Sequence, residues 1–188
     1  MSEEEITQQM KRLLYLIAEY SKLDGKYGVL SIKELPVKTL IFKGIRDNIF
    51  DYDYAPQSLM YIDNRRYLNV SQEGVDDLED LRELGYIQKI RLATKRHNYI
   101  YSYSLTPEGI QYLQSIPIDD KNAIDQFINC TCGNLYDIVV LPEDVVLTCD
   151  KCNIKINTEI TEIEDVKYKS APAALKTRLT VERGVENQ

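Results

Sequence analysis

Four cysteines in two close pairs constrain this chain of 188 residues more than any other feature. Cys130 and Cys132 enclose one residue, Cys149 and Cys152 enclose two, and sixteen residues separate the pairs. Four thiolates spaced in this way suit a tetrahedral Zn²⁺ with Zn–S bonds of about 2.3 Å. Because the protein then supplies all four ligands, no position is left for a reacting water. The sequence therefore predicts one structural zinc ion.

The residues around the cysteines predict a small β module of the zinc-ribbon type. Strand-like runs lie at residues 135–141, 145–148 and 154–160, and Gly133 and Asn153 follow the pairs, where a tight turn needs positive φ. A module of about 40 residues buries too little apolar surface to fold alone, so the metal supplies folding free energy. Two alternatives stay open. These are two disulfides, which a reducing cytosol disfavours, and four free thiols.

Composition excludes several classes of protein. The apolar fraction of 44% allows a packed core, and a single His excludes histidine pairs and multi-histidine metal sites. No apolar run approaches the roughly 20 residues of a membrane helix, and the acidic start lacks the features of a signal peptide. P-loop, dinucleotide-binding and G-x-S-x-G motifs are absent from the sequence. We therefore expect a cytoplasmic protein that is not an enzyme and has no small-molecule substrate.

The net charge of −7 is unevenly distributed along the chain. Residues 1–118 carry a net charge of −2, residues 119–165 carry −8, and residues 166–188 carry +3. Such asymmetry favours separate modules. We expect a first domain at 1–118, the zinc ribbon at 119–165 and a flexible basic tail at 166–188.

Hydrophobic spacing in the first domain predicts alternating helices and short strands. Apolar residues three and four apart predict helices at residues 3–20, 37–50 and 71–84. A strand at 29–30 and a helical turn at 32–35, ended by Pro36, are expected between the first two. Further strands are expected at 59–62, 67–70, 86–92 and 98–105. Thr106 as N-cap and Pro107 as first helical residue then predict a last helix.

The residues that end the third helix and follow the second hairpin resemble a known family. The two segments are Leu81-Arg-Glu-Leu-Gly-Tyr-Ile87 and Leu105-Thr-Pro-Glu-Gly-Ile110. They resemble winged-helix regulators of the PadR and MarR type, and the resemblance covers about residues 1–118. It implies an α+β fold, a winged helix-turn-helix domain followed here by the zinc ribbon. The combination is similar in architecture to archaeal transcription factor E, whose modules contact polymerase and open promoter DNA.

A basic hairpin is the candidate DNA-contacting element, the wing of the implied fold. Its basic residues, which can follow phosphates without reading sequence, are Lys89, Arg91, Lys95 and Arg96, and Arg65 and Arg66 of the earlier hairpin join them. Tyr99, Tyr101 and Tyr103 alternate onto one face, where core packing is favoured over base stacking. The expected function is DNA binding in transcription, as a regulator or as a polymerase-associated factor.

The helix before the wing argues for a second kind of partner. It carries six acidic residues and one basic residue, Arg82, and phosphates lining a major groove repel carboxylates. The alternative function is therefore a non-enzymatic adaptor that docks the transcription machinery or a second copy of itself. In that reading the acidic helix, the ribbon and the tail make the contacts, since fold does not determine function.

Overall fold

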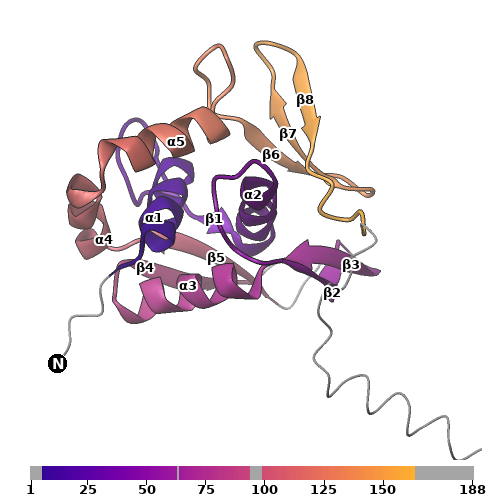
Figure 1. Ribbon diagram of the computed structural model, residues 1–188, viewed down its shortest axis with the longest axis horizontal. Coiled ribbons are helices and arrows are strands. Elements are labelled where there is room, and N and C mark those ends of the chain that lie inside the picture. Colours follow the sequence, from indigo (N-terminus) through magenta and orange to yellow (C-terminus); the bar gives the residue numbers. More distant parts are fainter. Residues whose placement is uncertain (1–5, 63, 94–98, 164–188) are drawn as a thin grey trace, which may run out of the picture.

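The computed structural model describes residues 6–62, 64–93 and 99–163, and over these it is mixed α+β with small antiparallel sheets (Figure 1). The helices are α1 (Gln8–Tyr20), α2 (Glu34–Arg46), α3 (Gln72–Glu83), α4 (Pro107–Tyr112), the 3₁₀ turn η1 (Leu113–Ser115) and α5 (Ile118–Ile128). The strands are β1 (Ile32–Lys33), β2 (Ala55–Tyr61), β3 (Asn64–Val70), β4 (Ile87–Leu92), β5 (Ile100–Leu105), β6 (Asp137–Val140), β7 (Val145–Cys149) and β8 (Ile154–Asn157).

The main core lies between the helices and a three-stranded sheet with the order β1-β5-β4. Helix α1 contacts α3, α5 and β5, and its Leu13, Leu14 and Ile17 are fully buried. Tyr103 of β5, paired with both Ile32 and Lys89, closes the core from the sheet side. Burial of large apolar side chains from elements distant in sequence therefore holds the helices and the sheet together.

Local sequence determines where two helices begin, and these two predictions are confirmed. Ser71 accepts a hydrogen bond from the N–H of Gly74, and Thr106 accepts one from the N–H of Gly109. Gly85 has φ of +80° after α3, as expected for a helix end. At Gly109 a Cβ atom would lie 2.0 Å from the carbonyl oxygen of Tyr86, so only glycine allows α4 to approach the start of β4 this closely.

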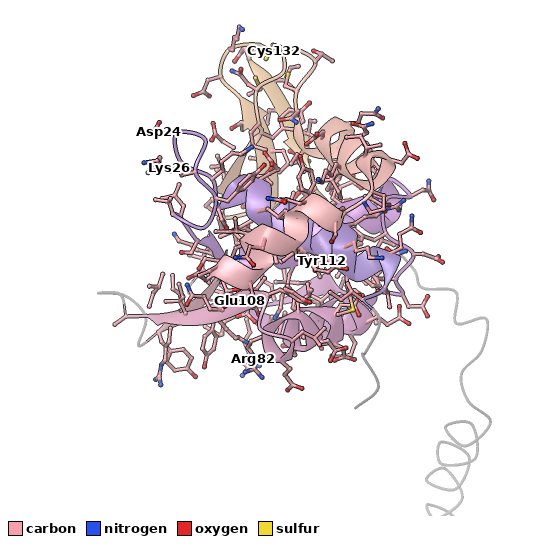
Figure 2. All side chains as sticks on the ribbon, turned by 90° about the vertical axis from the view of Figure 1, so that its left-hand side faces the viewer. Asp24, Lys26, Arg82, Glu108, Tyr112 and Cys132 are labelled. Carbon is pink, nitrogen blue, oxygen red and sulfur yellow. The ribbon has the colours of Figure 1, made fainter. Side chains whose placement is uncertain are left out.

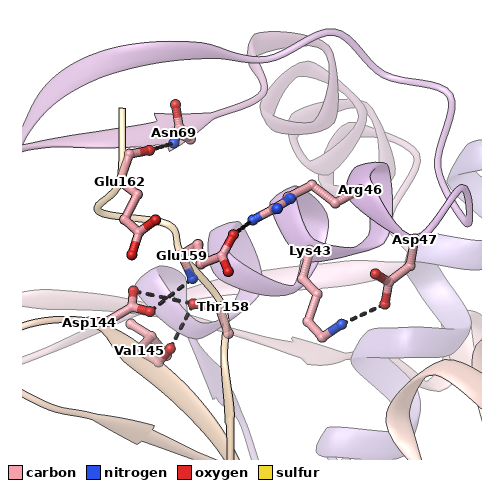
Figure 3. Close-up of polar contacts among 9 residues, drawn as sticks. All are labelled: Lys43, Arg46, Asp47, Asn69, Asp144, Val145, Thr158, Glu159 and Glu162. Atoms are coloured by element: carbon pink, nitrogen blue, oxygen red, sulfur yellow. Dashed lines mark hydrogen bonds and ion pairs between the residues drawn. The ribbon is translucent and has the colours of Figure 1, made fainter. Parts of the chain in front are cut away.

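A second cluster joins the β2–β3 hairpin to the C-terminal sheet. Phe42 of α2 and Leu68 of β3 pack with Val145 and Ile160, which belong to the sheet of order β6-β7-β8 and the chain that follows it. Asn69 holds the same chain by donating from its side chain to the carbonyl of Glu162 (Figure 3). The hairpin is thus covered by residues far along the sequence.

Three expectations about secondary structure were wrong in detail. The strand expected at 29–30 is instead β1 at Ile32–Lys33, where pairing with β5 overrides the local capping pattern. Pro36 lies in the first turn of α2 rather than ending a helix, because the first turn does not need its backbone N–H. The hairpin strands β2 and β3 are longer than expected, since residues 55–58 and 64–66 also pair.

Helix α5 was not anticipated at all. Its buried Ile124, Phe127 and Ile128 join the main core, and its buried Asp120 forms an ion pair with Arg12 of α1 at 2.7 Å. Hydrophobic spacing does not reveal this helix, because its buried face includes Asp120 as well as apolar residues. In the described ranges, none of the helices has the length and apolar character that crossing a membrane requires.

Candidate metal centre and basic surface

The four cysteines come from two turns at one end of the molecule. Cys130 follows α5 and Cys132 lies in the next turn, whereas Cys149 ends β7 and Cys152 precedes β8. Gly133, with φ of +83°, and Asn153, with φ of +51°, close the two turns, as their positions in the sequence predicted. The N–H of Gly133 donates to the carbonyl of Cys130 at 2.8 Å, which shapes the first turn.

The four sulfur atoms have the separations of a tetrahedral metal site. All of them lie within 4.8 Å of one another, and the Sγ atoms of Cys132 and Cys149 are 3.6 Å apart. Four Zn–S bonds of about 2.3 Å at tetrahedral angles would place the sulfurs about 3.8 Å apart. The cysteine cluster can therefore hold a metal ion such as zinc.

The thiols differ in how readily they ionise. The backbone N–H of Cys132 lowers the pKa of the Cys130 thiol to about 6, whereas hydrogen bonds with Cys132 and Cys130 raise the pKa of Cys152 to about 12. Neighbouring thiolates repel one another, so four of them ionise together only around a cation. The donor set is thus matched to a thiophilic divalent ion.

The metal centre lies far from helix α3. Figure 2 shows Cys132 at one end of the molecule and Arg82 of α3 at the other. A metal at the cysteines would therefore stabilise the β6–β8 sheet and would lie far from the surface of α3.

The basic residues expected on the wing have different surroundings. Lys89 of β4 donates to Glu79 of α3 at 2.7 Å, so much of its charge is compensated. Arg91 of β4 is exposed, and its guanidinium lies 4.1 Å from the ring centre of Tyr99. Lys95 and Arg96 lie outside the described residues. Among the described residues of this hairpin, Arg91 is thus the expected phosphate contact that is exposed to solvent.

The two arginines of the β2–β3 hairpin point to opposite faces. Arg66 lies over the ring of Tyr61 and donates to the carbonyl of Glu143 at 3.5 Å, so it faces the β6–β8 sheet. Arg65 lies on the outer, exposed face, directly opposite Met60. The six basic positions expected from sequence therefore do not form one described surface.

Several carboxylates of helix α3 accept hydrogen bonds from neighbouring elements. Asp77 accepts from the hydroxyl of Tyr52, and Glu73 accepts from the backbone N–H of Asp53 at 2.7 Å. Burial raises the pKa of Asp77, whereas the hydrogen bond from Lys89 lowers the pKa of Glu79. Asp76, Asp80 and Glu83 remain exposed.

A polar cavity of about 250 Å³ separates the end of α2 from the chain after β8. Arg46 pairs with Glu159 across it, and Lys43 pairs with Asp47 within the end of α2 (Figure 3). The backbone N–H of Glu159 donates to Asp144 at 2.8 Å. These pairs explain the cavity as part of the contact that docks the β6–β8 sheet.

The three wing tyrosines are only partly core residues, which sequence reasoning missed. Tyr103 is 1% exposed and Tyr101 is half-buried, but Tyr99 is 45% exposed. Their spacing of two residues indicates that the three tyrosines share one face of the strand. The spacing does not indicate how far along the strand the helices cover that face.

The chain belongs to the uncharacterized protein MJ1567 family, whose model matches residues 9–177. The match includes both the helices and the cysteine module. Searches of curated proteins and of solved structures found no match.

Proposed function

We propose that this chain is a non-enzymatic winged-helix and zinc-ribbon protein that binds double-stranded DNA in transcription. The order α1, β1, α2, α3, β4, β5 carries the proposal, together with the sheet order β1-β5-β4. A winged helix has three helices and a three-stranded sheet in this order. In this reading β4–β5 is the wing, and the β2–β3 hairpin is an insertion between the second and third helices.

The charges of the described residues indicate how DNA would be contacted. Arg91 is exposed on the wing, where it can reach phosphates, and the neighbouring Lys95 and Arg96 add to the positive charge of this hairpin in the sequence. The exposed carboxylates of α3 would be repelled from a major groove. The wing and not α3 is therefore the proposed contact, giving affinity with little sequence readout.

A salt titration of duplex DNA binding tests this proposal. We expect log K to fall linearly with log salt, and Arg91→Ala to reduce the slope by about one phosphate contact. The Lys95→Ala/Arg96→Ala double variant should reduce it by about two. Lys26→Ala is the matched control, because it also removes one positive charge. Figure 2 shows Lys26 well away from Arg82 of α3, and α3 is the helix whose Glu79 contacts the wing. No duplex binding at low salt would refute the proposal.

We also propose that Cys130, Cys132, Cys149 and Cys152 hold one structural Zn²⁺. The sulfur separations and the all-thiolate donor set support it. Bound zinc would supply charge compensation and folding free energy to the β6–β8 sheet. Metal analysis should give close to one zinc per chain, and the zinc should be absent from Cys149→Ser. Thr131→Ser is the control and should retain the zinc, because it changes the residue between Cys130 and Cys132 without removing a ligand. A metal-free protein in which the turns at Cys130–Gly133 and Cys149–Asn153 stay ordered would contradict the assignment.

A second candidate function, a protein adaptor, is favoured by the outer face of the β2–β3 hairpin. Met60 is 58% exposed and Tyr67 is 57% exposed, and both lie on the face that carries Arg65. A protein partner docked on this face would remove both apolar side chains from water. Self-association is the simplest form to test. Sedimentation should show a dimer that is lost in Met60→Ser/Tyr67→Ser and kept in Lys26→Ala, whereas a monomer at all concentrations would exclude a second copy as the partner.

A further inference from the structure

The inner face of the wing is buried at one end of the hairpin and exposed at the other. Ile87 pairs with Leu105 and Lys89 pairs with Tyr103, so these residues and Arg91, Tyr101 and Tyr99 follow one another on a single face. The face begins in the main core and ends in solvent, since exposure rises from Tyr103 through Tyr101 to Tyr99. The outer part therefore presents aromatic rings that the helices do not cover.

These rings are held in a defined arrangement. The Tyr99 and Tyr101 ring centres are 5.3 Å apart with an interplanar angle of 60°. The guanidinium of Arg91 lies over Tyr99, and Lys89 lies 4.9 Å from the ring centre of Tyr101. Two aromatic rings and two cations thus share a small surface, and cation–π contacts limit their motion.

This combination suits bases more than an apolar protein segment. A flat base can stack on a tyrosine or on an arginine plane, and the accompanying phosphates gain from the positive charge. Such stacking needs the base to be unpaired, because in a duplex its faces are covered by neighbouring base pairs.

The adjoining helix discourages a duplex at the same place. Glu79 pairs with both Lys89 and Arg82, and the exposed Asp80 and Glu83 lie on the same helix. A duplex brings two phosphate backbones toward these carboxylates, whereas one strand on the outer wing brings a single backbone beside Arg91.

We infer that the outer wing face of Arg91, Tyr99 and Tyr101 binds single-stranded DNA by stacking unpaired bases. This inference rests on the proposed DNA-binding function and specifies its substrate class. The wing would then bind the duplex through phosphate contacts alone and bind unwound segments more tightly. Tyr99 and the Arg91 plane would be the stacking surfaces, and Arg91 would compensate a phosphate in both cases.

The absence of tryptophan from the sequence provides a direct readout. A Tyr99→Trp variant has one tryptophan, whose emission reports stacking by a base. Single-stranded DNA should quench this emission, and the same sequence annealed into a duplex should quench it much less. A Tyr67→Trp variant, with its reporter exposed on the other hairpin, is the control and should show no quenching with either form.

Affinity measurements complete the test. Tyr99→Ala should weaken single-strand binding about tenfold, Tyr99→Phe should retain most of it, and duplex binding should be nearly unchanged in both. If duplex DNA binds and neither form of DNA quenches the emission of the Tyr99→Trp variant, the inference is overturned while the proposed function stands. If neither form binds at low salt, both are overturned.

Discussion

The helical body and the cysteine module are stabilised in different ways. In the body, side chains from α1, α2, α3, α5 and the β1-β5-β4 sheet pack into one large core. The β6–β8 sheet contributes Leu147 to that core and Val145 to the smaller cluster. Leu135, close to the cysteines, is exposed, and so are Val139 and Val140, which pair with Val146 and Val145 at the other end of the sheet. The module is thus held by apolar packing at its base and, if metal binds, by four thiolates at its tip.

The difference teaches that one sheet can depend on two separable sources of stability. Packing at the base persists without metal, because Val145 and Ile160 are buried by α2 and the β2–β3 hairpin. Thiol coordination acts at the other end. Four changes test how separate these sources are.

The largest effect is expected from losing a metal ligand. Cys149→Ser should remove the zinc and unfold the tip of the module, since structural zinc contributes about 10 kcal/mol or more to small modules that fold around it. Amide hydrogen exchange should rise sharply in the turns at Cys132 and Cys152, and amides of α1 should keep their protection. Loss of protection in α1 to the same degree would show that the body and the module unfold as one unit.

A large effect confined to the body is expected from Gly109→Ala. The new Cβ would overlap the carbonyl oxygen of Tyr86, so α4 must move away from β4 at a cost of about 3 kcal/mol. Urea unfolding measures the loss, and zinc content should stay at the wild-type level. Gln111→Ala, an exposed change in the same helix, serves as control and should alter stability by less than about 0.5 kcal/mol.

A moderate effect is expected where the two regions meet. Val145→Ala removes two buried methyl groups from the smaller cluster and should cost about 2 kcal/mol, including the cavity left behind. The partly exposed Val139 of the same sheet gives the matched comparison, and Val139→Ala should cost much less. Equal losses in the two variants, measured by urea unfolding, would mean that the burial of Val145 in the smaller cluster does not stabilise this end of the sheet.

The smallest effect concerns the ion pairs between α3 and the wing. The hydrogen bond from Lys89 keeps the pKa of Glu79 below its ordinary 4.5. Its contribution is therefore present above pH 4.5 and is lost as the pH falls through the lower folded-state pKa. Glu79→Gln should reduce stability by less than about 1 kcal/mol at neutral pH and have no effect in stronger acid. A loss that is the same at both pH values would assign the cost to packing instead.

The features predictable from sequence are those set by neighbouring residues. The caps at Ser71 and Thr106, the positive φ of Gly85 and the gathering of the cysteines each depend on a few adjacent positions. Their chemistry is nearly independent of the rest of the chain, so the residue types alone indicate the geometry.

Features that depend on distant partners were missed or misplaced. Strand β1 forms because β5 pairs with it, and α5 is fixed by α1, where Arg12 compensates the buried Asp120. On the wing, alternation indicated a shared face for the tyrosines, but the edge of the helical layer decides which of them reaches solvent. Neither the pairing of β1 with β5 nor the edge of the helical layer can be predicted from the residues next to them in the sequence.

The β2–β3 hairpin is held by hydrogen bonds to residues made much later, which affects how the protein folds during synthesis. Tyr61 donates to the carbonyl of Leu141, 80 residues later, and Asn69 donates to that of Glu162, 93 residues later. At about 5–20 residues per second, a ribosome needs about 5–20 seconds to synthesise the covering segment. Throughout that interval the nascent hairpin lacks the cover that Val145 and Ile160 give it. Residues 141–162 therefore complete a structure that the first half of the chain begins.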